Sequence, residues 1–508
     1  MGQTSGNLGP VPAPRPLSEF GLHARGDWDV QITGVSVDSR DVKTGHLFAA
    51  LPGVKAHGAE FIQYALRMGA AAILTDPQGA EIAAKDLASY PEVAVVVVEE
   101  PRAALAYTSA LWFGGQPEIM VAATGTNGKT SVATFTRQIW EELGLAAVNF
   151  GTTGVEGAVS APLNHTTPEP ITLHRLLAKL KAEGITHAAM EASSHGLAQN
   201  RLDGVRLMAA AFTNFSQDHL DYHKDFDDYF NAKAGLFNRV LADEGTAVIN
   251  TDDPRGKDMQ EIALDRGHRV LTIGHGDCDM RIMGQRYDAT GQDLLFEFMG
   301  ENHHARLNLI GGFQAENILA ATGLVIGTGI EPQEVFQTLP HLTTVRGRMQ
   351  LAATRANGAP VFVDYSHTPE AVATALKALR PHVMGKIVVL VGAGGDRDTS
   401  KRPLMGRAAC ENADVVFVTD DNPRSEDPAV IRAAVMAGCA EVEGITAVEV
   451  GDRAEAILRG VDALGPGDAL LICGKGHETG QVVGDQVLPF DDCEQASVAV
   501  AALEGRLT

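Results

Sequence analysis

The chain has 508 residues, of which 45% are hydrophobic and 21% charged, an ordinary balance for a globular protein. This length is too great for a single hydrophobic core and suggests about three domains. Acidic residues outnumber basic ones by 64 to 41, and the formal net charge of -23 disfavours nucleic acid and anionic membranes as partners, except at a local positive site.

The cysteines and the N-terminus indicate the compartment. Five dispersed cysteines without a C-x-x-C pair are typical of free thiols in a reducing environment. The first twenty residues, MGQTSGNLGPVPAPRPLSEF, lack the apolar segment of a signal peptide. The longest aliphatic run, residues 93–98, is far too short to span a membrane. We therefore expect a soluble cytoplasmic protein, with a flexible tail over residues 1–18.

Short aliphatic runs alternate with helix-like segments along the chain, which predicts an α/β fold with mostly parallel sheets. The clearest strands are expected at residues 93–98, 119–123, 187–190, 208–212, 247–249, 360–363, 387–391, 415–418 and 469–473. Glycine-rich or polar stretches follow most of these runs directly. Because parallel sheets bind ligands beyond the carboxyl ends of their strands, we expect the functional residues in these loops.

Two turns divide this series of strands. FGGQPE, residues 113–118, precedes the predicted strand at residues 119–123. TTVRGR, residues 343–348, precedes the series of predicted strands that begins at residue 360. We predict an N-terminal domain over residues 1–116, a central domain over 117–346 and a C-terminal domain over 347–508, all of ordinary domain size.

The strongest motif is ATGTNGKT, residues 123–130, between a predicted strand and a predicted helix. Glycines let backbone N–H groups converge on phosphate oxygens, Lys129 can reach the outer phosphates, and Thr130 can ligate Mg²⁺. The first position is Ala123, where this pattern usually has glycine. A glycine-rich turn without a ligand is the alternative, but the order strand, G-K-T and helix favours phosphate binding.

Three further residues of the middle region could serve such a site. Glu191, in MEASSHG, could hold Mg²⁺, although an isolated glutamate at a strand end is commonly a surface acid. His219, in NFSQDHLDYH, could be a metal ligand, an orienting group, or a capping residue on the surface. Lys233, in DDYFNAKAGLF, is by composition a solvated helix lysine.

The last third of the chain contains TDDNPRSEDP, residues 419–428, whose composition is that of a surface turn. Its Arg424, however, is the side chain best suited to grip a carboxylate with two parallel hydrogen bonds. Arg397, in GAGGDRD, and Glu478, in GKGHE, also follow predicted strands. Two arginines for a carboxylate and one glutamate for an ammonium group would form a suitable pocket for a zwitterion.

Taken together, these motifs resemble the Mur ligase family of ATP-dependent amino-acid ligases. The motifs that carry the resemblance extend over residues 35–478: TGTNGKTS, HTTPEP, MEASSHG, DHLDYH, NAKAGLF, GGFQAEN, RGRM, VDYSHTPE, GGDRD, DNPR and GKGHE. The resemblance implies an N-terminal domain for the UDP end of a substrate, a central P-loop ATPase and a C-terminal Rossmann-like domain for the incoming amino acid. Gln314 departs from the family, which usually has asparagine there, whereas Asn317 is retained.

The resemblance also implies residue roles. ATP would contact Gly125, Thr126, Asn127, Gly128, Lys129, Thr130, Ser131, Asn317, Arg348 and Asp364. Mg²⁺ would be held by Thr130, Glu191, His219 and Lys233, with Lys233 as N6-carboxylysine. Lys129, Glu191, His219 and Lys233 would be the catalytic residues.

Two substrates are implied besides ATP. UDP-N-acetylmuramoyl-L-Ala-D-Glu would contact Val37, Ser39, Val54, Lys55, Ala56, Thr166, Thr167, Ser193, Gln199 and Arg201. Meso-diaminopimelate would contact Arg397, Asp421, Asn422, Arg424, Gly474 and Glu478. The implied reaction joins diaminopimelate to the D-glutamate γ-carboxylate through an acyl phosphate, releasing ADP and phosphate, in cytoplasmic peptidoglycan synthesis.

Three other functions are weighed against this one: a muramoyl ligase that adds lysine, a folylpolyglutamate-type ligase, and a P-loop module without turnover. DNPR and GKGHE together disfavour both ligases, and a P-loop module needs no amino-acid pocket. We therefore expect an enzyme with ATP and Mg²⁺ as cofactors, a monomer, and no nucleic-acid or membrane partner.

Overall fold

In the computed structural model the described residues are 12–26, 28–53, 56–216, 218 and 222–506. The chain divides into two compact units. The first comprises Met1–Cys278 and Leu319–Val335, and the second comprises Asp279–Ile318 and Phe336–Thr508. Helices α10 (Phe313–Gly327) and α11 (Pro332–Thr338) carry the chain from one unit to the other.

The first unit begins with a small parallel sheet of order β3-β4-β5-β6. Its strands are Gly34–Ser36, His46–Ala49, Ala72–Thr75 and Ala94–Val97, and its helices α1 to α4 are Ile62–Arg67, Pro77–Ile82, Ala84–Leu87 and Pro101–Phe113. Before this sheet, β1 (Arg15–Pro16) pairs antiparallel with β2 (Gln31–Ile32), and Leu17 is buried. Leu17 packs into the hydrophobic core formed by the strands of this small sheet. The prediction of a flexible tail up to residue 18 is therefore wrong for its last residues.

A larger sheet follows in the same unit, in the order β13-β12-β11-β7-β10-β8-β9. All neighbours run parallel except β8 and β9. The strands β7 to β13 are Ile119–Thr124, Ala147–Gly151, Gly154–Gly157, His187–Glu191, Leu207–Phe212, Leu241–Asn250 and Arg269–Gly274. The helices α5 to α9 are Lys129–Glu142, Pro170–Ala182, Ser194–Ala198, Phe226–Gly235 and Gly256–Asp265. In the central strand β7 every residue after Ile119 is buried and all but Thr124 are apolar, which suits a strand covered on both faces.

The second unit contains three antiparallel strands, β14 (Met280–Asp288), β15 (Gly291–Phe298) and β16 (Glu301–Leu307). It also contains a sheet of order β17-β18-β22-β19-β20-β21, parallel except for β17. These strands are Gln350–Thr354, Pro360–Asp364, Ala469–Cys473, Ile387–Val391, Val415–Val418 and Thr446–Glu449. A hairpin of β23 (Gly480–Val483) and β24 (Gln486–Pro489) follows β22.

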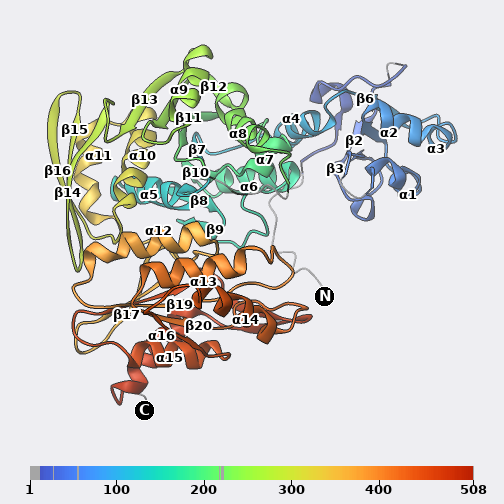
Figure 1. The fold of residues 1–508 in the computed structure, drawn as a ribbon. Helices are drawn as coiled ribbons and strands as arrows, with labels where there is room; N and C mark the ends of the chain where they lie inside the picture. The colour runs from blue at the N-terminus through green and yellow to red at the C-terminus, as the bar shows by residue number, and fades with distance from the viewer. Residues whose placement is uncertain (1–11, 27, 54–55, 217, 219–221, 507–508) are drawn as a thin grey trace. The chain divides into compact units, whose positions relative to one another are not determined.

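Helices cover both faces of the six-stranded sheet of the second unit (Figure 1). One core joins α12 (Pro369–Leu379), α13 (Lys401–Asn412) and α14 (Pro428–Cys439) to one face. The other core joins α15 (Arg453–Asp462) and α16 (Asp492–Leu503) to the opposite face. This is a doubly wound arrangement, and its loops at the carboxyl ends of β18, β19, β20 and β22 lie where such folds bind ligands.

The predicted α/β class with mostly parallel sheets is confirmed, and each of the nine predicted strands is present as β6, β7, β10, β11, β12, β18, β19, β20 or β22. Strand β12 begins at Leu241, earlier than the predicted residue 247. Its first part contains exposed and polar residues, so the apolar run in the sequence marks only the end of the strand. The five cysteines are free thiols, as predicted. The boundaries at residues 116 and 346 stay predictions. In the part of the chain that the structure describes, no helix is both long enough and apolar enough to cross a membrane.

Candidate active site

The loop between β7 and α5 has the geometry of a phosphate-binding loop. Strand β7 ends at Thr124, and α5 begins at Lys129. Gly125 and Gly128 have φ angles of 146° and 88°, which side chains other than hydrogen rarely allow. A Cβ atom at Gly125 would also collide with Thr213 Oγ1. The glycines predicted from the motif are therefore required by the loop's backbone.

The segment after β11 holds this loop in place. Asn214 accepts a hydrogen bond from Thr126 N at its backbone oxygen (2.9 Å) and one from Asn127 N at its side-chain oxygen (2.8 Å). Thr213 Oγ1 donates to the carbonyl of Asn127 over 2.5 Å. Sequence reasoning missed both supporting residues, although they follow a predicted strand directly.

Two lysines meet at the phosphate-binding loop. Lys129 Nζ donates to the carbonyls of Gly125 and Thr126 over 2.9 and 2.8 Å, and Lys233 Nζ donates to the same Gly125 carbonyl over 2.7 Å. Lys233 is only 1% exposed, so its interpretation as a solvated helix lysine is wrong. Burial, aided by the charge of Lys129, holds the pKa of Lys233 well below its usual value, while Asp218 acts in the opposite direction. Two lysine side chains this close, one of which is hard to keep charged, make the loop a place for anionic charge.

Glu191, the last residue of β10, faces the loop and is 2% exposed, which excludes the surface-acid interpretation. Thr130 Oγ1 donates to Glu191 Oε2 over 3.0 Å. Thr152, which sequence reasoning missed, donates to the same carboxylate from its backbone N (2.7 Å) and its hydroxyl (3.1 Å). The carboxylate and the Thr130 hydroxyl are the hard oxygen donors that Mg²⁺ prefers, and they fit that ion. Lys233 would fit only if its amine became an anion. His219 lies outside the described residues.

A cluster of polar groups continues from Glu191 toward α7. Thr167 Oγ1 donates to the Glu191 carbonyl (2.9 Å) and accepts from Ser193 N and Oγ (both 3.0 Å). Arg201 donates to the Thr167 carbonyl over 2.6 Å and to Gln199 Oε1 over 2.8 Å. The structure therefore brings together these four residues of the predicted UDP-substrate set.

The remaining residues of that set lie less centrally. Thr166 joins the cluster through Thr152, with 3.0 Å between their hydroxyls. Val37 and Ser39 lie near the end of β3, and no hydrogen bond between described residues connects them or Ala56 to the cluster. Val54 and Lys55 lie outside the described residues.

In the second unit, the loops after β19 and β20 are tied together. Gly395 N donates to the Asn422 carbonyl over 2.9 Å, and Arg424 Nη1 donates to the Gly395 carbonyl over 2.8 Å. Ser425 Oγ donates to Asp396 over 2.6 Å. Arg424 takes a left-handed backbone with φ of 51°, which is uncommon outside glycine and marks a constrained position.

Arg424 and Arg397 are available for an anion. The side-chain hydrogen bonds of Arg424 with described residues use Nη1, which leaves its Nε and Nη2 edge for a ligand. Arg397 is exposed, and among the described residues its side chain donates only to the Asp396 carbonyl. Neither guanidinium has a carboxylate at ion-pair distance among the described residues. In so acidic a chain, two unpaired arginines on adjoining loops indicate anion recognition.

The loop after β22 joins the same region. Asn422 Nδ2 donates to Glu478 Oε2 over 2.9 Å. Asp421 is buried against Gly474, where a Cβ atom would collide with its carboxylate. Five of the six residues predicted for diaminopimelate thus lie in contacting loops: Asp421, Asn422, Arg424, Gly474 and Glu478. Arg397, the sixth, is on the loop tied to them.

A buried ion pair that sequence reasoning missed supports these loops. Arg453, at the start of α15, is paired with Asp492, and both side chains are 0% exposed. Arg453 also donates to the carbonyls of Asp420 and Cys473 over 3.2 and 2.9 Å. The arginine therefore fixes the end of β22 beside the loop after β20. No local pattern distinguishes such a residue from a surface arginine.

The other predicted nucleotide contacts belong to the second unit. Asp364, at the end of β18, accepts from Met349 N and Ser366 N over 2.7 and 2.8 Å. Asn317 donates to Gln314 Oε1 over 3.1 Å, and Arg348 lies over the Tyr365 ring, 4.6 Å from its centre. Their roles toward ATP stay predictions.

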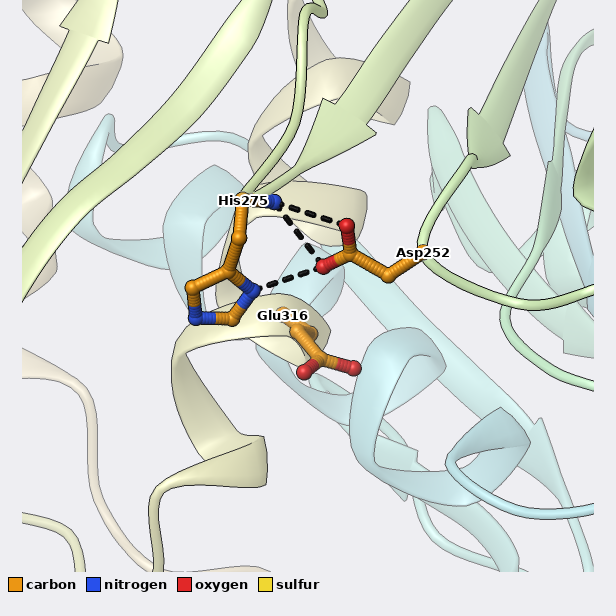
Figure 2. Close-up of side chains that lie close together, drawn as sticks. All are labelled: Asp252, His275 and Glu316. Atoms are coloured by element: carbon orange, nitrogen blue, oxygen red, sulfur yellow. Dashed lines mark hydrogen bonds and ion pairs between the residues drawn. The ribbon is translucent and has the colours of Figure 1, made fainter.

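One further pair in the first unit was not predicted. Figure 2 shows His275, just after β13, beside Asp252, just after β12. His275 donates from its backbone N to Asp252 Oδ1 over 2.9 Å, and its Nδ1 lies 2.6 Å from Oδ2. Their positions in the sequence could have indicated this pair, since both residues follow neighbouring parallel strands of the sheet.

The sequence matches known families along nearly its whole length. Residues 123–325 match the Mur ligase middle domain, residues 347–476 match the Mur ligase glutamate ligase domain, and residues 31–112 match the Mur ligase family catalytic domain. The chain belongs to the Mur ligase family. This Mur ligase is an ATP-dependent ligase, and the three-domain fold implied by the motifs is confirmed.

Close relatives of this Mur ligase carry one name. It is 48% identical to the UDP-N-acetylmuramoyl-L-alanyl-D-glutamate--2,6-diaminopimelate ligase of Bradyrhizobium diazoefficiens, over 93% of this chain and 96% of the relative. It is 47% identical to the ligase of the same name from Brucella melitensis, over 93% and 95%. A solved structure of that name has 31% identity and a TM-score of 0.72, covering 97% of this chain and 100% of the other.

Proposed function

We propose that this Mur ligase joins meso-diaminopimelate to the D-glutamate γ-carboxylate of UDP-N-acetylmuramoyl-L-Ala-D-Glu in peptidoglycan synthesis. The observation that carries the proposal is Arg424, a constrained arginine with no carboxylate partner among the described residues and with one edge of its guanidinium left for a ligand. Diaminopimelate differs from lysine by a carboxylate at its far end, which such an edge can hold with two hydrogen bonds. The names of the relatives support the same substrate.

The first step that we propose is in-line attack of the γ-carboxylate oxygen on the γ-phosphorus of ATP. A bond forms between that oxygen and phosphorus, the bond to the bridging oxygen breaks, and ADP leaves. Backbone N–H groups of residues 125–131 would hold the phosphates, and Lys129 would exchange its two loop carbonyls for γ-phosphate oxygens. Arg348 would stabilise the charge that develops on the phosphoryl group, while Asn317 and Asp364 would bind the nucleoside.

Lys233 would take part as a carbamate. Its low pKa supplies neutral amine, whose nitrogen attacks CO₂, forms an N–C bond and releases a proton to solvent. The product is an anionic oxygen ligand in place of an amine that lies beside Lys129. With Thr130, Glu191 and His219, carboxylated Lys233 would hold Mg²⁺. When bound, Mg²⁺ neutralises phosphate charge as a Lewis acid.

In the second step, the free amine of diaminopimelate attacks the acyl phosphate carbonyl. The N–C bond forms, the C–O bond to phosphate breaks, and the amine loses its proton. Arg397 and Arg424 would hold carboxylates of the amino acid, and Glu478 would hold an ammonium group. Asp421, Asn422 and Gly474 would shape the pocket. The buried ion pair Arg453–Asp492 supports this role by fixing the loops that carry these residues.

The UDP substrate would lie along the cluster of Thr166, Thr167, Ser193, Gln199 and Arg201, near the Glu191 carboxylate. Its uridine end would contact Val37, Ser39 and residues 54–56. Since these substrates are charged nucleotides and amino acids of the cytoplasm, we propose that the enzyme works there, as a monomer.

Phosphate release tests this function. We expect release from ATP only when UDP-N-acetylmuramoyl-L-Ala-D-Glu and meso-diaminopimelate are both present, with lysine run in parallel. Equal turnover with lysine would favour the lysine-adding ligase. Release without the UDP substrate, or no release with any amino acid, would contradict the proposed function.

A further inference from the structure

Lys475 is a buried lysine in the loop after β22, and the proposed reaction does not use it. Its side chain is 0% exposed. Its Nζ donates to Asn422 Oδ1 and Glu478 Oε2, both over 3.1 Å, and to the Gly480 carbonyl over 2.5 Å. An ammonium group has three N–H donors, and all three have acceptors here. A buried charge so fully satisfied is costly to place and calls for a role.

Lys475 determines how the Asn422 amide is oriented. Asn422 Oδ1 accepts from Lys475 Nζ and from Val482 N (2.9 Å), while its Nδ2 donates to Glu478 Oε2 (2.9 Å). Because an ammonium can only donate, the amide oxygen must face Lys475 and the amide nitrogen must face Glu478. Without the lysine, one of the two donors that select this orientation is lost.

The same contacts hold one end of the Glu478 carboxylate. Oε2 accepts from both Lys475 and Asn422, whereas Oε1 receives no hydrogen bond from any described residue. The carboxylate is therefore fixed by one oxygen and keeps the other for a ligand. A side chain fixed in this way loses little conformational freedom when it binds an ammonium group.

The network also reaches Arg424 through β23. Val482, anchored on Asn422, accepts from Arg424 N over 3.0 Å at its carbonyl, and Gly484 N donates to the Arg424 carbonyl over 2.7 Å. These bonds hold Arg424 in its left-handed conformation. One buried ammonium thus connects the residue proposed for the ammonium end of the amino acid with the residue proposed for its far carboxylate.

We propose that Lys475 is a positioning residue of the amino-acid pocket, acting through Asn422 and Glu478 without touching the substrate. The proposal rests on the proposed function, because it concerns affinity for diaminopimelate. It predicts a selective effect: the amino acid binds less well, while ATP and the UDP substrate bind as before. A lysine that only stabilises the fold would lower the melting temperature and leave the ratio of these three affinities unchanged.

The first experiment compares Lys475→Met, which keeps the side-chain length but removes the charge, with Lys386→Met at an exposed lysine before β19. We expect the KM for meso-diaminopimelate to rise about tenfold or more in Lys475→Met, as for loss of a hydrogen bond to a charged group, with the other two KM values unchanged. Lys386→Met should leave all three unchanged. An unchanged KM for diaminopimelate in a folded Lys475→Met protein overturns the proposal.

A second variant keeps the lysine and covers the case in which Lys475→Met fails to fold. Asn422→Ala removes the amide through which Lys475 acts, and it should raise the same KM selectively. Where Lys475→Met does fold, the two effects should be less than multiplicative in the double variant, because both changes break one network. Multiplying effects, or a normal KM in Asn422→Ala, would overturn the proposal. If the wild-type enzyme itself shows no turnover that depends on diaminopimelate, the proposed function fails instead.

Discussion

The phosphate-binding loop and the loops after β19, β20 and β22, which we propose to hold the amino acid, are built in opposite ways. The phosphate-binding loop is one short stretch of chain, and the groups proposed to hold phosphate are its own backbone N–H groups and Lys129. The residues proposed to bind the amino acid come from three loops, and the outermost of them, Arg397 and Glu478, are 81 positions apart. Side-chain contacts of Lys475 and Arg453 hold the later two of these loops. The first is specified locally, while the second depends on the packing of the whole sheet.

The two buried lysines illustrate the difference. Burial, together with the charge of Lys129, favours loss of a proton from Lys233. Lys475 Nζ contacts the carboxylate of Glu478 and two further acceptors, which fix its position. Both lysines look alike in the sequence. We therefore expect Lys233 to take part in the reaction and Lys475 to orient other side chains. The following predictions test this difference between the two regions.

The largest effect is expected at Lys129. Lys129→Met should lower kcat/KM by roughly a thousandfold or more with every amino acid tested, because it removes a charge that stabilises phosphoryl transfer. Phosphate release measures this, with Lys257→Met, at an exposed lysine of α9, as the matched control. A loss restricted to diaminopimelate would show that the two regions are not separate in function.

Nearly as large an effect is expected at Lys233. Lys233→Met should lower kcat by about a hundredfold to a thousandfold through loss of an anionic group beside the phosphates. Intact-protein mass spectrometry in bicarbonate buffer should find the added mass of one CO₂ on the wild type and not on the variant. A fully active wild type without that mass would contradict the carbamate.

Arg424→Ala should lower kcat/KM for diaminopimelate by about a hundredfold, since a charged contact with the far carboxylate is lost. The KM for ATP should not change. Arg424→Lys should recover part of the activity, because it restores the charge but not the two parallel hydrogen bonds. Arg459→Ala, an exposed arginine of α15, is the control. Wild-type kinetics in Arg424→Ala would remove the basis for choosing diaminopimelate over lysine.

The smallest effects come from a pair of glycines, one in each region. A Cβ atom at Gly125 would collide with Thr213 Oγ1, and one at Gly395 would collide with the Pro423 carbonyl. The collision in each alanine variant should lower the free energy of unfolding by about 1–3 kcal/mol. Gly125→Ala should raise mainly the KM for ATP, and Gly395→Ala mainly that for diaminopimelate. Identical kinetic changes in both variants would mean that the regions respond as one.

Much of the fold could be predicted because buried parallel strands are short, continuous apolar runs. Strands β19, β20 and β22 are of this kind, and their ends were predicted to the residue. Strand β3 escaped, since three residues do not form a recognisable pattern. Leu17 also escaped, because a proline-rich surrounding resembles a disordered tail although the leucine itself is buried.

The sequence by itself determined the phosphate-binding loop, the order of the motifs and the family, since each depends on neighbouring residues along the chain. Only the tertiary structure decided that Glu191 and Lys233 are buried, and that Lys475 contacts Asn422 and Glu478. It also decided that one edge of Arg424 has no partner among the described residues. Burial and charge pairing depend on segments far apart in the chain. A lysine in a sequence does not reveal which groups the fold will bring to it.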